Sequence, residues 1–129
     1  MNSFEIKVIT KNSIPVLQVS GYFSADSGTK LEEIVEGLLQ KGSLFMVVDF
    51  SNCKLINSPG VYVLMETAMK IVDDYCGRIL LCGLDELKLS VFTMAGVFLF
   101  AEVAKTCEEA VQNIKQVPAP STVKKILKM

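Results

Sequence analysis

The chain has 129 residues, half of them hydrophobic, and a formal net charge of −1. This length and composition predict one domain with one substantial core rather than a disordered chain. The near-neutral charge disfavours a dedicated nucleic-acid-binding function. No apolar stretch is long enough to cross a membrane, and the first residues lack the pattern of a secretory signal, so we expect a cytoplasmic protein.

Histidine is absent, and none of the four cysteines belongs to a Cys-x-x-Cys pair. These features disfavour zinc fingers, zinc hydrolases and histidine-based catalysis, so we predict neither a metal nor a cofactor. A disulfide framework is not expected in a chain without an export signal. A cysteine enzyme using Cys53 or Cys76 is the weakest of the functional hypotheses, because no basic side chain is clearly placed to activate either thiol.

The first third of the chain predicts a hairpin followed by a helix. Residues 4–10 alternate between apolar and polar, and residues 16–19 form a second strand that closes at Gly21. A helix should then follow the cap candidates around Ser24 and end at Gly42. Its buried stripe has helical spacing and consists of Leu31, Ile34, Val35, Leu38 and Leu39.

The centre of the chain predicts a buried strand, a turn and a second helix. The apolar run 44–48 has the length of a central strand, and a polar turn should follow it. Ser58 is predicted to be the N-cap of the next helix, with Pro59 as its first residue. This helix should reach about Tyr75 before Gly77 ends it.

Ser58 has two interpretations. The simpler one is a capping residue that satisfies a backbone N–H group. The other is a phosphorylation site, where a phosphate would benefit from the helix macrodipole and add nearly two negative charges. The local pattern favours the cap.

The last third predicts strand, helix, strand and helix. Residues 79–82 form a short buried strand, and a third helix then runs from about Leu84 to Ala95, with Asp85 in its first turn and Gly96 as its stop. Residues 97–103 are predicted to be the last strand. Thr106 should cap a short final helix that ends near Ile114, with Glu109 reaching back as in a capping box.

The resulting order is β-β-α-β-α-β-α-β-α. It predicts an α/β fold in which an N-terminal hairpin and alternating strands and helices form a mixed sheet covered by helices. We expect one domain over residues 1–116. Residues 115–129 hold four lysines and no acidic residue, whereas residues 1–114 have a net charge of −5. Segment 117–129 is predicted to be a basic tail or a short extra helix, either solvated or in contact with an acidic partner or membrane surface.

Several segments, in this order, resemble the STAS domain family, and within it the bacterial anti-sigma factor antagonists. The resemblance covers about residues 4–114 and rests on Gly21, Val47-Val48-Asp49-Phe50-Ser51, Ile56-Asn57-Ser58-Pro59-Gly60-Val61, Leu80-Leu81-Cys82-Gly83-Leu84, Met94-Ala95-Gly96-Val97 and Glu108-Glu109-Ala110. It implies a STAS-like fold and a non-enzymatic regulator of transcription, either a monomer or a weak dimer, that does not contact nucleic acid directly.

The resemblance also implies a mechanism. Such antagonists bind an anti-sigma factor that is also a serine kinase, the kinase phosphorylates them, and a phosphatase resets them. The serine at the matching position is Ser58. The partner-binding residues implied here are Ser24, Asn57, Ser58, Pro59, Gly60, Val61 and Tyr62, with residues 98–100 as an extension.

Three positions depart from the family pattern. Asn57 stands where the family has an aspartate, Pro59 where it has serine or alanine, and Ser24 where it has another aspartate. The altered turn supports an alternative function, that of a non-phosphorylated STAS adaptor or a subunit of a larger signalling or transport complex.

Overall fold

The computed structural model describes residues 3–115, which form a five-stranded sheet covered by helices. The strands are β1 (Phe4–Lys11), β2 (Ile14–Phe23), β3 (Phe45–Ile56), β4 (Arg78–Cys82) and β5 (Glu102–Val103). The helices are α1 (Ala25–Gln40), α2 (Ser58–Met69), α3 (Glu86–Ala95) and α4 (Cys107–Ile114), with short helical segments η1 (Lys70–Asp74) and η2 (Val97–Leu99). Along the described chain the element order is the predicted one.

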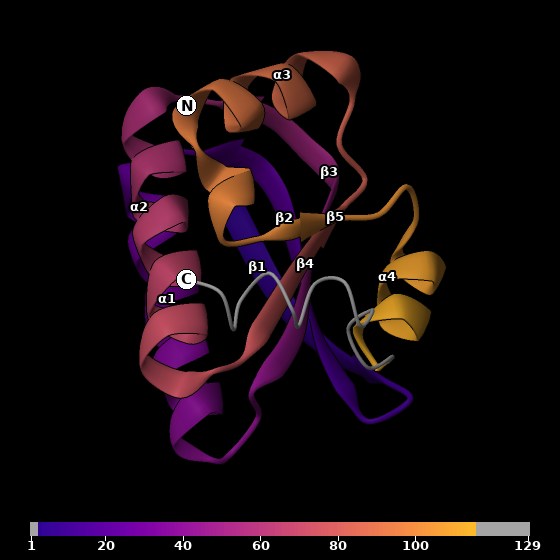
Figure 1. Ribbon diagram of the computed structural model, residues 1–129. Coiled ribbons are helices and arrows are strands. Elements are labelled where there is room, and N and C mark those ends of the chain that lie inside the picture. The colour runs from indigo at the N-terminus through magenta and orange to yellow at the C-terminus, as the bar shows by residue number, and fades with distance from the viewer. Residues whose placement is uncertain (1–2, 116–129) are drawn as a thin grey trace.

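The strands lie side by side in sequence order, and only the β1–β2 pair is antiparallel (Figure 1). This arrangement confirms the predicted mixed sheet. A two-residue turn joins β1 to β2, and both of its residues have positive φ, 51° at Asn12 and 70° at Ser13. Positive φ at both positions defines the type I′ turn, whose twist matches that of the flanking strands.

Two strands are longer than predicted. β2 does not close at Gly21, because register shifts let it continue along β3 to Phe23. The polar turn expected after Val48 is also absent, because β3 continues through Ile56. Ser51, Asn52, Lys54 and Leu55 of this second half are exposed, so the strand lacks the apolar run by which its first half was predicted.

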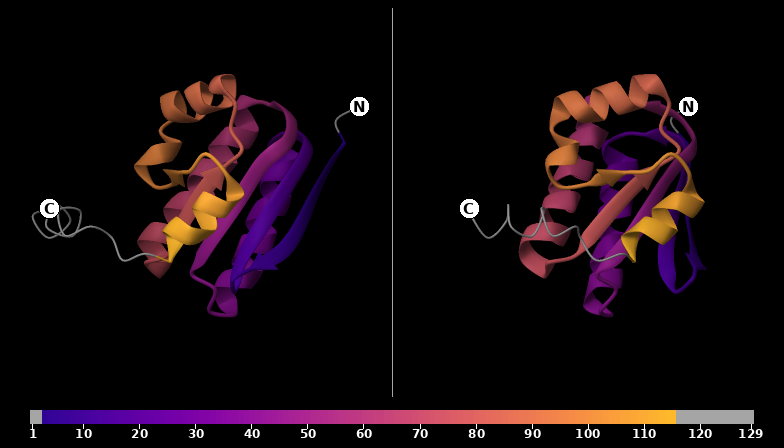
Figure 2. Two further views of the ribbon diagram at one scale, coloured as in Figure 1. Left: turned by 90° about the vertical axis from the view of Figure 1, so that its right-hand side faces the viewer. Right: turned by 45° about the vertical axis from the view of Figure 1, so that its right-hand side comes forward.

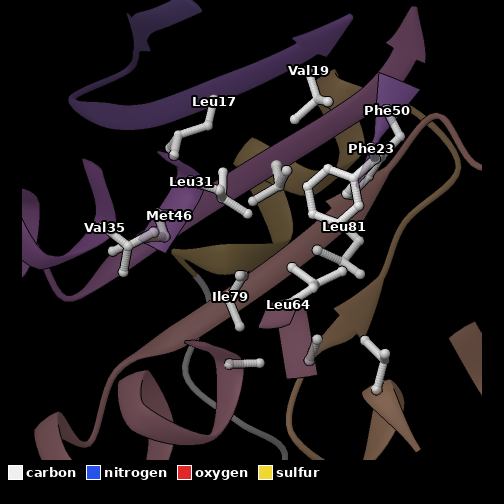
Figure 3. Close-up of a cluster of buried hydrophobic side chains, with 14 of the residues drawn as sticks. Leu17, Val19, Phe23, Leu31, Val35, Met46, Phe50, Leu64, Ile79 and Leu81 are labelled. Atoms are coloured by element: carbon white, nitrogen blue, oxygen red, sulfur yellow. The ribbon is translucent and has the colours of Figure 1, made fainter. Parts of the chain in front are cut away.

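Helices cover both faces of the sheet. α1 and α2 pack on one face and α4 on the other (Figures 1 and 2). Because neighbouring strand residues point to opposite faces, Val48 joins the core under α1 and α2, whereas Val47 joins the core under α4. Figure 3 shows the first core, in which Leu31 and Val35 of α1 and Leu64 of α2 meet Met46, Ile79 and Leu81 of the strands.

Three buried phenylalanines join the strands to α3. The ring of Phe50 in β3 lies edge-on to Phe23 in β2 and to Phe92 in α3, with centroid distances of 5.3 Å in both pairs. Edge-to-face contacts of this kind stabilise a core by about 0.5–1.5 kcal/mol beyond area burial. Phe50 therefore holds together the end of the sheet where α1 and α2 begin.

The C-terminal third corrects two predictions. Asp85 is the N-cap of α3, not a residue of its first turn, and its carboxylate accepts the Lys88 N–H at 2.8 Å. Residues 97–103 do not form one strand: they contain η2 and the two-residue β5. Gly96, with φ of 88°, ends α3 as predicted and turns the chain so that Val97 enters the core.

α4 has the predicted bounds and cap. Thr106 accepts the Glu109 N–H at 3.1 Å. The Glu109 carboxylate, however, accepts the N–H of Lys105 at 3.3 Å instead of completing a capping box on Thr106.

Within residues 3–115, no helix is both long and apolar enough to span a membrane. The predicted tail, 117–129, lies outside the described residues and stays a prediction.

Replacing Phe50 by alanine should lower the free energy of unfolding by about 3–5 kcal/mol, because the fully buried ring leaves a cavity between two aromatic neighbours. Met94→Ala is the control, since this side chain is 85% exposed and should change stability by no more than about 0.5 kcal/mol. Urea unfolding monitored by circular dichroism measures both values. Similar losses in the two variants would contradict the assignment of Phe50 as a core residue.

Candidate functional site

The candidate site lies at the carboxyl ends of the parallel strands β2 and β3, where α1 and α2 begin. This is the edge at which α/β sheets usually place their functional residues. Ser24 is the N-cap of α1, and Asn57 is the N-cap of α2. The fold therefore brings together two segments that the sequence separates by a whole helix and strand.

Asn57, and not Ser58, caps α2. The side-chain oxygen of Asn57 accepts the Gly60 N–H at 3.0 Å, and its amide nitrogen donates to the Tyr22 hydroxyl at 2.9 Å. Ser58 is then the first residue of the helix and Pro59 the second, so the prediction of Ser58 as the cap is wrong. The Ser58 side chain is exposed and makes no hydrogen bond within residues 3–115, which leaves its hydroxyl free of a structural role.

Gly60 allows α2 to start directly against the turn between β2 and α1. A Cβ atom on Gly60 would lie 2.7 Å from the Phe23 carbonyl oxygen and 2.8 Å from that of Ser24. These are backbone atoms, so they cannot give way as the end of a flexible side chain would. The Asn57 N–H donates to the same Phe23 oxygen at 3.1 Å. Only glycine permits this approach without moving one of the two helices.

Ser27 and Tyr22 complete the network, and the functional hypothesis from the sequence did not include them. The buried Ser27 hydroxyl donates to the Tyr22 carbonyl oxygen at 2.6 Å and accepts the Ser24 N–H at 2.8 Å. The position of Ser27, three residues after a serine N-cap, is the signal that could have identified it. Together these bonds fix the start of α1 beside the start of α2.

The predicted contact residues differ in exposure. Ser58, Pro59 and Tyr62 are exposed, and Ser24 and Asn57 are partly buried. Gly60 and Val61 are buried, and the Val61 side chain packs into the core, so neither residue offers an exposed side chain, and their role in partner binding stays a prediction. Of the predicted extension, Leu99 is 80% exposed, whereas its two aromatic neighbours pack against the core.

An apolar stripe continues from Ser58 along the exposed face of α2. Tyr62, Met65 and Met69 follow Ser58 at helical spacing, and Tyr62 is 52% exposed. η2 lies beside α2 (Figure 1), and its Leu99 side chain extends the stripe, since both Met65 and Leu99 approach Gly96. We call the surface formed by Ser58, Tyr62, Met65, Met69 and Leu99 the α2–η2 surface.

Acidic side chains border this surface. A shallow groove of about 410 Å³ runs along α2 and is lined by Glu32, Tyr62, Met65, Glu66, Met69, Lys70, Asp73 and Asp74. Lys70 is paired with Glu36 of α1, and this hydrogen bond raises the pKa of Lys70. The carboxylates therefore dominate the charge of the groove, which suits a partner surface with basic groups around an apolar centre.

Cys53 lies near this edge as a buried, free thiol. Cys53 is 5% exposed, and burial raises the pKa of its thiol, which donates to the Leu55 carbonyl oxygen at 3.4 Å. A thiol held protonated in this way is a poor nucleophile.

Comparison with known proteins gives a match at the level of structure alone. No family model and no curated protein sequence matches the chain. Solved structures, in contrast, do match the chain. An anti-sigma factor antagonist from Mycobacterium paratuberculosis superposes with a TM-score of 0.77 at 16% identity, covering 89% of this chain and 97% of that one. The chain has the STAS fold.

Two further structures have the same fold. A putative anti-sigma factor antagonist from Thermotoga maritima matches with a TM-score of 0.75 at 14% identity, over 86% of this chain and 95% of that one. The Bacillus cell-fate determinant SpoIIAA in its phosphorylated form matches with a TM-score of 0.64 at 18% identity, over 88% and 100%. In this STAS fold, the candidate site is the junction of β2, α1, β3 and α2.

Replacing Asn57 by alanine should lower the free energy of unfolding by about 1 kcal/mol, because α2 loses its cap and Tyr22 loses a hydrogen bond. Asn57→Asp should retain most of the stability, since a carboxylate also caps and is favourable at a helix N-terminus. Ser58→Ala is the control and should change stability by no more than about 0.5 kcal/mol. Thermal unfolding distinguishes these outcomes. A larger loss of stability in Ser58→Ala than in Asn57→Ala would show that Ser58 is the N-cap.

Proposed function

We propose that this protein is an anti-sigma factor antagonist-like regulator that binds a serine-kinase anti-sigma factor through the α2–η2 surface and is switched by phosphorylation of Ser58. The observation that carries the proposal is the free, exposed Ser58 hydroxyl at the N-terminus of α2, beside an apolar stripe. In this function the protein acts in the cytoplasm, without catalytic activity of its own, and a phosphatase restores the unmodified serine.

The position of Ser58 suits a kinase substrate. Its side chain has no capping role that phosphorylation would disrupt, because Asn57 accepts the Gly60 N–H in its place. A phosphate on the first residue of a helix is stabilised by the macrodipole. Phosphorylation should therefore leave the fold intact.

The same modification should prevent docking. The α2–η2 surface presents apolar groups next to Ser58, and carboxylates already border it. A phosphate adds nearly two negative charges that would have to be desolvated in the interface. A partner that accommodates a neutral hydroxyl and a tyrosine ring would then be repelled, so the unmodified protein is the active form.

The fold neighbours support the class of function. The structures with this fold include proteins described as anti-sigma factor antagonists, and SpoIIAA among them is known in phosphorylated and unphosphorylated forms.

The turn of this chain favours a second candidate, a STAS adaptor without a phosphoswitch. Asn57 brings no negative charge to the site, and Pro59 leaves the second residue of α2 without an N–H donor.

The switch is tested by affinity capture from extracts of the native cells. Immobilised Ser58→Ala protein should capture a protein with an ATP-binding serine-kinase domain, identified by mass spectrometry, whereas Ser58→Glu should lose it. The two variants should have the same melting temperature within about 2 °C, as expected for an exposed position. Capture of the same partner by both would favour the adaptor, and capture of no kinase by either would contradict the proposed partner.

Tyr62→Ala should weaken binding to the captured partner by roughly tenfold or more, because an aromatic side chain at the centre of a contact surface contributes strongly. Val8→Ala is the control: Val8 is 43% exposed, but it lies on β1 at the far edge of the sheet. Binding is measured by isothermal titration calorimetry with the purified partner. Unchanged affinity for Tyr62→Ala would exclude the α2–η2 surface as the docking site.

A further inference from the structure

A second group of polar side chains lies on the opposite face of the sheet, under α4. Asp49 of β3 and Cys82 of β4 are direct cross-strand partners, and Cys107 is the first residue of α4. One carboxylate oxygen of Asp49 and the two Sγ atoms all lie within 4.8 Å of one another. The three residues are far apart in the sequence, which is why their spacing gave no metal motif.

The geometry of this group is close to that of a metal shell. Two thiolates and a carboxylate are ligands of Zn²⁺, with bond lengths of about 2.3 Å to sulfur and about 2.0–2.2 Å to oxygen. In a tetrahedral shell these lengths separate neighbouring donors by about 3.5–3.8 Å. The three donor atoms would therefore have to approach one another by no more than about 1.3 Å.

The surroundings orient the donors. The Ser51 N–H and hydroxyl both donate to the same oxygen of Asp49, at 2.9 and 2.6 Å, which holds the carboxylate in place. Hydrogen bonds of this kind are the usual support of a metal-binding carboxylate. Cys82 is fully buried, whereas Asp49 and Cys107 are partly exposed, so water can reach the group from one side as a fourth ligand.

The charges of these three residues and their neighbours also suit a divalent cation. Asp49 and two thiolates carry three negative charges, which exceed the charge of a divalent cation by one, and Lys11 is the cation that acts on Cys107. Glu108 is the further carboxylate nearby. Cys107 is at the N-terminus of α4, where the macrodipole favours a thiolate. Burial raises the pKa of both thiols, so without a metal they are protonated and slow to oxidise.

We propose that Asp49, Cys82 and Cys107 form a binding site for a thiophilic divalent cation, Zn²⁺ foremost, that ties α4 to the middle of β3 and the end of β4. On binding, each thiol forms a bond from sulfur to the metal and releases its proton to solvent, so two protons leave for each metal ion bound and no electron is transferred. The site is independent of the α2–η2 surface and of the phosphoswitch.

The test is titration of the reduced full-length chain with Co²⁺, followed by displacement with Zn²⁺. One Co²⁺ per chain should produce an intense thiolate-to-cobalt charge-transfer band, and one equivalent of Zn²⁺ should remove it. Cys107→Ser should weaken Zn²⁺ binding by roughly hundredfold or more, since even loss of a supporting residue costs 10–100-fold. Cys76→Ser is the control, because Cys76 is an exposed cysteine outside the group.

Circular dichroism of Cys107→Ser must show a folded protein, and Asp49→Asn, which keeps both sulfur ligands, provides a second variant with an expected loss of affinity. The absence of a charge-transfer band with the parent protein would overturn the proposal. So would unchanged Zn²⁺ affinity in Cys107→Ser, or a Cys82–Cys107 disulfide in protein isolated from its native cells.

Discussion

The site depends on one close backbone contact, between the start of α2 and the turn that joins β2 to α1. Gly60 faces the carbonyl oxygens of Phe23 and Ser24 with no room for a Cβ atom, and the Asn57 N–H donates to Phe23. This contact brings the first turns of two helices to one edge of the sheet. It also determines which residue caps α2, because Asn57 is held between the Phe23 carbonyl and the Tyr22 hydroxyl.

The proposed switch follows from this division of roles. Asn57 supplies the capping oxygen, so the hydroxyl of the next residue is not needed for stability and can be modified without loss of the helix. Ser58 is thereby an exposed group on a rigid support, and the exposed face of α2 carries apolar side chains next to it. A chemical change at one atom can then alter docking while the fold stays the same.

Most of the fold could be predicted because its signals are local. The helical spacing from Leu31 to Leu39, the stop at Gly96 and the cap at Thr106 depend on neighbouring residues, and the structure confirms them. The second half of β3 could not be predicted, since its exposed polar residues are in a strand only because β2 pairs with them. The sequence places the cap of α2 one residue late, because Asn57 and Ser58 are both good caps and only tertiary contacts choose between them. Val61 was similarly ambiguous: its burial depends on how α2 packs on the sheet.

The central claim is that Ser58 is a regulatory group and not a structural one. The most direct measurement is the intact mass of the protein isolated from its native cells under several growth conditions, with peptide mapping of residues 55–70. The account predicts a fraction of chains that carry one phosphate, located on Ser58 alone. A protein that is unmodified under every condition, or one that is phosphorylated elsewhere, would contradict the switch and leave the fold with a constitutive docking surface.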